Sequence, residues 1–183
     1  MSQRVVLEEY SERWAALYAQ EHERVRRALA PAQFAFYHIG STAVPGLLAK
    51  PVIDMLLVAP STEVLDEASP LLETLGYEPR GEYGIVGRRY FVRCKAGSMR
   101  MHLHAFAQGA PQVAAHLAFR DRLIASEEAR KAYADAKRAA ARGGAARKDE
   151  YQRDKADCIA RILSECDVSR SGRTSLSACS AIR

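Results

Sequence analysis

Apolar and polar residues alternate along the chain in a way that predicts several short strands. Two stretches, 34–39 and 52–58, are compact apolar runs rich in aromatic and branched side chains, as strands buried in a sheet are. Residues 98–107 alternate strictly, which places His102 and His104 on one face of a strand and the apolar residues between them on the other. The pattern predicts strands at residues 4–8, 34–39, 52–58, 98–107 and two more, joined by a glycine-rich turn, within 76–95.

The remaining pattern is helical and lies mostly in the second half of the chain. Apolar residues recur at helical intervals over 14–30 and 62–75, and the signals are helical throughout 111–164. Ser11 and Ser126 are suited to be N-caps. After Cys166 the sequence is rich in serine and has no periodicity. We therefore predict an α/β (α+β) protein with one domain over residues 1–166 and a disordered tail over 167–183.

Composition narrows the classes of partner. The 183 residues carry a net charge of +5, which favours an anionic ligand, either a small molecule or a nucleotide. Nucleic acid is an unlikely partner because no lysine and arginine cluster is interleaved with aromatic residues. No apolar run reaches the length of a membrane span, and the first residues lack the apolar centre of a signal peptide. We expect a cytoplasmic protein with no membrane partner, and its oligomeric state stays open.

Residues 38–55 hold the densest set of chemically useful side chains. A strand runs into Gly40 and Ser41, where a turn lets the backbone approach a ligand and a hydroxyl face a phosphate, although most Gly-Ser pairs are simple turns. Lys50 offers a counter-charge. Asp54 interrupts an apolar strand, and a carboxylate there must be paired, hydrogen-bonded or bound to metal. The alternative to a functional role is that Asp54 is a structural residue, in an ion pair with Lys50 or an arginine.

The histidines extend this candidate site. His102 and His104 project from the same face of their strand, and with Asp54 they would make a metal-binding triad. The alternative is that one histidine packs under the helices while the other is solvated. His38, beside the Gly-Ser turn, is a third candidate, whereas His22 and His116 are interpreted as helix-surface residues.

Basic residues in later segments offer further phosphate contacts. Arg88 lies in the glycine-rich turn and could fold over an anion. Arg120 is suited to pair locally with Asp121. Lysines follow tyrosines at helical spacing, which indicates either packing or the basic wall of a phosphate pocket, at Tyr133 and Lys137 and again at Tyr151 and Lys155.

These motifs together resemble the GrpB family, whose members also occur fused to dephospho-CoA kinase. The resemblance covers about residues 5–165 and rests on HIGSTAVPGLLAKPVIDM, HLH, FRD and the two Tyr-x-x-x-Lys pairs. It implies a fold similar to the polymerase β nucleotidyltransferases, with a mixed sheet flanked by helices and a helical C-terminal part. In that fold a Gly-Ser turn contacts nucleotide phosphates and carboxylates on neighbouring strands hold two metal ions.

One departure from that superfamily concerns the carboxylates. The expected Asp-x-Asp pair is absent, because either Val52 or Leu56 stands where the partner of Asp54 would be. A histidine of the HLH strand is then the replacement for a third carboxylate. Imidazole suits zinc, manganese or iron better than magnesium. The identity of the divalent cation stays open among Mg²⁺, Mn²⁺ and Zn²⁺.

The leading prediction is an enzyme of nucleotidyltransferase type. It would move a nucleotidyl or phosphoryl group from a nucleoside triphosphate to a small-molecule acceptor, with a divalent metal. Asp54, His104 and His38 would be catalytic, and Asp54, His102 and His104 would bind the metal. The predicted phosphate-binding residues are Gly40, Ser41, Lys50, Arg88, Arg120, Tyr133, Lys137 and Lys155. The alternatives are a non-catalytic binding or chaperone-like module and a metal-dependent hydrolase.

Overall fold

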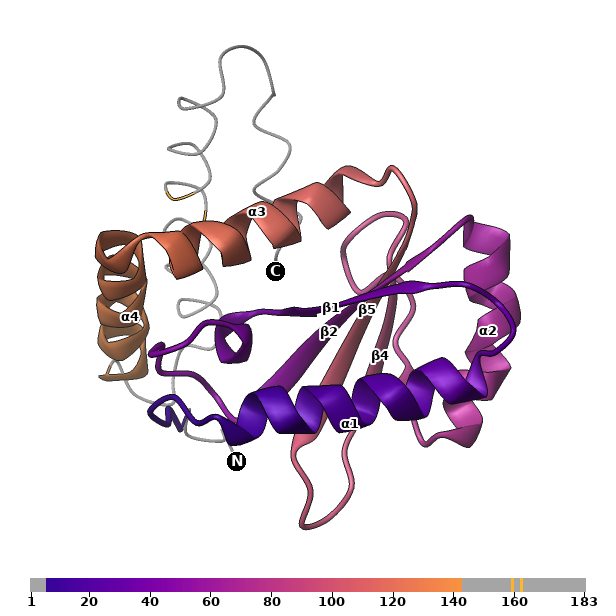
Figure 1. Ribbon diagram of the computed structural model, residues 1–183, viewed down its shortest axis with the longest axis horizontal. Coiled ribbons are helices and arrows are strands. Elements are labelled where there is room, and N and C mark those ends of the chain that lie inside the picture. Colours follow the sequence, from indigo (N-terminus) through magenta and orange to yellow (C-terminus); the bar gives the residue numbers. More distant parts are fainter. Residues whose placement is uncertain (1–5, 143–158, 160–161, 163–183) are drawn as a thin grey trace.

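The computed structural model describes residues 6–142 together with Ile159 and Ile162. Its elements follow the predicted order (Figure 1). The helices are α1 (Arg13–Ala28), α2 (Thr62–Thr74), α3 (Pro111–Ala125) and α4 (Glu127–Arg142), with a short 3-10 helix, η1 (Ser41–Ala43). The strands are β1 (Ala35–Ile39), β2 (Val52–Ala59), β3 (Glu78–Pro79), β4 (Arg89–Arg93) and β5 (Arg100–Ala107). The predicted α+β architecture is confirmed.

A single mixed sheet with strand order β1-β2-β5-β4-β3 forms the centre. Its middle pair, β2 and β5, is parallel, and every other pair is antiparallel. The parallel register places Asp54 beside His102 and Leu56 beside His104. Because side chains two residues apart share a face of a strand, Asp54 and both histidines emerge on the same side of the sheet.

The two faces of the sheet bury different cores. Helices α1 and α2 pack on the face that presents Met55, Leu57 and Leu103. Helix α3 covers the opposite face, where Leu56 and Phe106 are fully buried. Figure 1 shows α1 and α3 running along opposite sides of the strands. The face that carries Asp54 is therefore the α3 face.

A third core joins the segment after η1 to the last helices. Val44, Leu47 and Leu48 are buried against α3 and α4, with Phe119 and Leu123 among their partners. This packing brings the 40s segment and α4 together although they are far apart in the sequence. It positions Lys137 of α4 beside the Gly-Ser turn.

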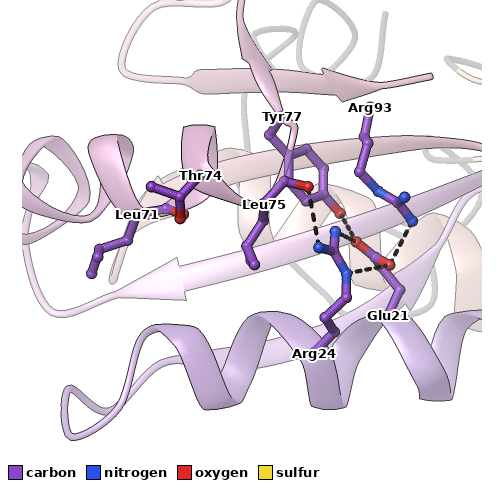
Figure 2. A network of polar contacts seen from close by, with 7 residues as sticks. All are labelled: Glu21, Arg24, Leu71, Thr74, Leu75, Tyr77 and Arg93. Atoms are coloured by element: carbon purple, nitrogen blue, oxygen red, sulfur yellow. Dashed lines mark hydrogen bonds and ion pairs between the residues drawn. The ribbon is translucent and has the colours of Figure 1, made fainter. Parts of the chain in front are cut away.

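A buried polar network joins α1 to the sheet face opposite Asp54 (Figure 2). The Glu21 carboxylate is 4% exposed and accepts hydrogen bonds from Arg24 at 2.6 Å, Arg93 at 2.7 Å and the Tyr77 hydroxyl at 2.8 Å. Arg24 also donates to the Leu75 carbonyl at 3.1 Å. Burial raises the pKa of Glu21, but these donors outweigh burial and the pKa is lowered. An ionised Glu21 thus holds three elements together.

Several predicted details change in the structure. Of residues 6–8, only Glu8 pairs, in an isolated bridge with Ala49, so the predicted strand at 4–8 is not formed over its described part. At the start of α1, Ser11 makes the predicted capping contact, since its hydroxyl accepts the Arg13 N–H at 3.3 Å, whereas Glu12 is already in a helical conformation and makes no side-chain cap. Ser126 does cap α4, accepting the Ala129 N–H at 3.1 Å. Apart from Ile159 and Ile162, which are helical, the predicted helix after residue 142 and the tail lie outside the described residues.

Candidate functional site

A cavity of about 220 Å³ opens on the α3 face of the sheet. Its walls come from the end of β1, η1, β2, the segment before β4, β5, α3 and α4. The lining residues are Ile39, Gly40, Ser41, Thr42, Lys50, Val52, Asp54, Tyr83, Arg88, Tyr90, His102, His104, His116, Phe119, Tyr133 and Lys137. Most of the predicted site residues therefore meet in one place.

Asp54, His102 and His104 form the polar floor of this cavity. Asp54 Oδ1 lies 3.2 Å from His102 Nδ1 and 3.4 Å from His104 Nε2. One ligand atom from each side chain lies within 4.8 Å of the other two. The Asp54 and His102 side chains remain 26% and 23% exposed, so a small ion can reach them.

The charge states of this cluster follow from its burial. Burial raises the pKa of Asp54, but hydrogen bonds with His102 and His104 outweigh that effect and hold the pKa well below its usual range. Burial lowers the pKa of His104 despite the nearby Asp54 carboxylate. At neutral pH an ionised carboxylate thus faces a neutral imidazole, which is the protonation state that metal binding requires.

Gly40 makes room for the Asp54 carboxylate. Its φ is +70° and its ψ is −171°, a conformation that is essentially restricted to glycine. A Cβ added at Gly40 would lie 2.5 Å from Asp54 Oδ2. The sequence predicted that this glycine lets the backbone approach a ligand, and the structure shows that the group approaching most closely is Asp54.

Ser41 and Lys137 meet in the same cavity. Lys137 is 3% exposed, and its ammonium donates to Ser41 Oγ at 2.9 Å and to the Leu48 carbonyl. The same ammonium lies over the Tyr133 ring, 4.7 Å from its centroid. The two residues predicted to bind phosphate are therefore neighbours, although 96 positions separate them in the sequence. Lys50 also lines the cavity.

Arg88 brings a buried guanidinium to the wall. It is 1% exposed and donates to the carbonyls of Glu82 at 3.0 Å and Tyr83 at 2.7 Å. Its guanidinium carbon lies 4.8 Å from the Tyr90 ring centroid. Arg88 thus organises the turn before β4 as well as facing the cavity.

His38 does not line the cavity. It neighbours Ile39 on β1 and so points to the α1 face, where its ring stacks on Tyr18 at 4.6 Å between centroids. Its Nε2 lies 3.1 Å from the Thr42 hydroxyl, which donates to the Val52 carbonyl, so His38 must be the donor. Burial lowers the pKa of His38 to about 4. The structure therefore does not bring His38 into the cavity with Asp54, His102 and His104.

One predicted phosphate ligand, Arg120, is held away from the cavity. Arg120 pairs with Asp121 at 2.7 Å, as the sequence predicted, and donates to the His38 carbonyl at 3.1 Å. It does not line the cavity, because its guanidinium ties α3 to β1. Lys155 lies outside the described residues.

The structure adds residues that the sequence interpretation missed. His116, interpreted as a helix-surface residue, is 6% exposed, lines the cavity and has its ring centroid 5.4 Å from that of His104. Its helical spacing to the buried Phe119 and Leu123 was a signal for this placement. Tyr90 is also buried against His104, with ring centroids 5.0 Å apart. Burial raises the pKa of the Tyr90 phenol.

Known structures show the class to which this fold belongs. Terminal uridylyl transferase 4 from Trypanosoma brucei, solved with bound dUTP, superposes with a TM-score of 0.55 at 12% sequence identity, covering 96% of this chain and 60% of that one. At this identity the likeness shows the fold alone, which is that of the nucleotidyltransferases. The predicted fold class is confirmed.

Within that class the chain belongs to the GrpB family. The family model described as GrpB protein matches residues 4–165. The crystal structure of GrpB from Enterococcus faecalis superposes with a TM-score of 0.77 at 29% identity, covering 88% of this chain and 99% of that one. The resemblance predicted from the motifs is confirmed.

Curated relatives from bacteria agree with this assignment. UPF0157 protein YqkA of Bacillus subtilis is 43% identical over 126 residues, 68% of this chain and 36% of YqkA. The chain therefore corresponds to little more than a third of YqkA. UPF0157 protein BH1888 of Halalkalibacterium halodurans is 35% identical over 167 residues, 90% of this chain and 83% of the relative. In residues 6–142, no helix is both long enough and apolar enough to cross a bilayer.

Proposed function

We propose that the protein is a metal-dependent transferase that moves a nucleotidyl or phosphoryl group from a nucleoside triphosphate to a small-molecule acceptor. One observation carries the proposal. The Asp54, His102 and His104 cluster opens into the same cavity as the Ser41–Lys137 pair. The proposed cation site and the proposed phosphate site would thus be adjacent on a nucleotidyltransferase fold.

The three side chains of the cluster fit a divalent cation. They supply one carboxylate oxygen and two imidazole nitrogens within 4.8 Å of one another. A two-histidine, one-carboxylate set favours manganese, iron or zinc over magnesium, which prefers oxygen ligands. A bound cation would polarise a phosphoryl oxygen and offset charge that develops on it.

The chain's own residues would hold the phosphates. The Lys137 ammonium and the Ser41 hydroxyl already face each other, so a phosphate oxygen can be placed to accept from both. The backbone at Gly40 adjoins Asp54, which would hold this phosphate near the cation. Arg88 would contribute positive charge from the opposite wall, through a guanidinium fixed by two loop carbonyls.

A two-metal mechanism finds no support in the cavity. Asp54 is the only acidic residue among the described lining residues. The adjacent same-face position, Leu56, is fully buried with Ile39 and Phe106 in an apolar cluster. A second carboxylate there would be buried among apolar side chains, so we propose a site for one cation.

Thermal stability tests the proposal directly. Metal-stripped protein would be titrated with Mn²⁺, Zn²⁺ or Mg²⁺, each with and without ATP, GTP, CTP or UTP. We expect Mn²⁺ or Zn²⁺ to raise the melting temperature and a nucleotide to raise it further. The Asp54→Asn variant should lose both shifts, whereas Asp121→Asn, which changes an exposed carboxylate outside the cavity, should keep them. Equal shifts in the two variants would contradict the assignment of Asp54.

The single carboxylate also favours a second candidate function, a non-catalytic module that binds a phosphorylated ligand. Turnover separates the two candidates. Release of pyrophosphate or nucleoside diphosphate, dependent on an added acceptor, supports the transferase. Stabilisation by nucleotide with no product from any acceptor tested supports the binding module.

A further inference from the structure

An exposed aromatic residue stands at the edge of the cavity. The turn before β4 places Tyr83 among the cavity-lining residues, yet Tyr83 is 67% exposed. Its φ is +44°, the only positive φ of a non-glycine residue in the described part of the chain. Such backbone strain is found mainly at functional sites, where surrounding contacts maintain it.

Several contacts within the turn and with the core hold this strained turn in place. The Arg88 guanidinium donates to the carbonyls of Glu82 and Tyr83, and the Gly87 N–H donates to Glu82 Oε1 at 2.7 Å. The Ile85 side chain anchors the turn in the core of the α3 face. These contacts fix the backbone that carries Tyr83 while its ring stays largely in solvent, so folding gains little from that ring.

Ring contacts connect Tyr83 to the cluster of Asp54, His102 and His104. The centroids of Tyr83 and Tyr90 are 5.4 Å apart, and those of Tyr90 and His104 are 5.0 Å apart. Tyr83 therefore stands two ring contacts from a cluster residue, on the wall that also carries Arg88. A ligand with phosphates at the cation would extend its next group along this wall.

We propose that Tyr83 is a stacking platform for the planar ring of the ligand, a nucleobase. This inference rests on the proposed function, since it takes the ligand to be a nucleotide. An exposed aromatic ring stacks on any base and distinguishes poorly among the four. Tyr83 thus supplies affinity for the ring, and the phosphates are bound independently of it.

Binding measurements separate the ring from the phosphates. Calorimetric titration in Mn²⁺ would compare ATP with inorganic tripolyphosphate, which has the phosphates and no ring. We expect Tyr83→Ala to weaken ATP binding roughly ten- to a hundred-fold and to leave tripolyphosphate binding unchanged. Tyr83→Phe keeps the ring and should bind ATP as the natural protein does. Val86→Ala is the matched control, because Val86 is 81% exposed on the same turn and does not line the cavity.

The outcomes distinguish this inference from the proposed function. If the natural protein binds both probes and Tyr83→Ala loses affinity for neither, the stacking role is wrong and the phosphate site stands. The stacking role is also wrong if Tyr83→Ala weakens both probes equally, because the change then acts on the phosphate site. If the natural protein binds neither probe, both proposals are overturned.

Discussion

Replacing Gly40 by alanine tests whether this glycine exists to accommodate Asp54. The new Cβ would lie 2.5 Å from Asp54 Oδ2 and 3.1 Å from the Cβ and Cγ of the same residue. It would also force alanine into a backbone conformation with φ +70° and ψ −171°. The carboxylate or the turn must therefore move.

The expected loss of stability has two parts. A non-glycine residue in this backbone region costs about 1–3 kcal/mol. Forcing an extra carbon into a packed site costs about 1–3 kcal/mol more. We expect Gly40→Ala to lower the free energy of unfolding by roughly 2–6 kcal/mol, within the total of about 5–15 kcal/mol that holds most domains together.

Urea denaturation of four variants separates the two parts. Gly97→Ala is the matched control, since Gly97 has φ +73° and a Cβ there would have no atom within 4 Å. Asp54→Ala and the Gly40→Ala/Asp54→Ala pair complete a double-mutant cycle. The pair should show a favourable coupling of roughly 1–3 kcal/mol, because removing the carboxylate removes the closest contact. Equal losses for Gly40→Ala and Gly97→Ala, with no coupling to Asp54, would refute the reasoning.

Three further predictions concern stability elsewhere in the fold. The pKa of His38 is about 4 in the folded protein against 6.5 for an ordinary histidine, so the unfolded chain binds its proton first as pH falls. Between pH 7 and pH 4 the natural protein should therefore lose roughly 3 kcal/mol of unfolding free energy relative to the His38→Gln variant, as measured by urea denaturation. A difference between the two proteins that does not change with pH would contradict the assignment. Glu21→Gln should cost about 3 kcal/mol in the same assay because it leaves the partly buried Arg24 and Arg93 without a carboxylate, whereas Glu23→Gln on the exposed face of α1 should have a much smaller effect. Ser126→Ala should cost about 1 kcal/mol through loss of the α4 cap, and Ser126→Asp should retain most of that stability.

The sequence predicted the sheet well because its strands are short and strongly patterned. The alternation of residues 98–107 placed His102 and His104 on one face, and β5 confirms it. Residues 4–8 lacked comparable length and alternation, and their described part makes a single bridge. Periodicity thus worked where a strand is long enough to have two distinct faces.

The site was harder to predict where the direction of a side chain decides. His38 and Ile39 are adjacent on β1. The five-residue strand does not alternate clearly between apolar and polar residues, so its sequence does not show which of the two faces Asp54. His116 looked exposed because α3 is weakly amphipathic in sequence, with histidine and alanine on its buried face. The Ser41–Lys137 contact depends on helix packing between distant segments, which no local pattern of residues reveals.

The order in which the site residues occur along the chain has a consequence for synthesis. Asp54, His102 and His104 all precede α3, whereas Lys137 follows it on α4. Because a chain leaves the ribosome from its N-terminus, the cation ligands emerge before the lysine that would hold phosphate. Under the proposed function, the nascent protein would therefore pass through a stage in which the three proposed cation ligands have left the ribosome and Lys137 has not.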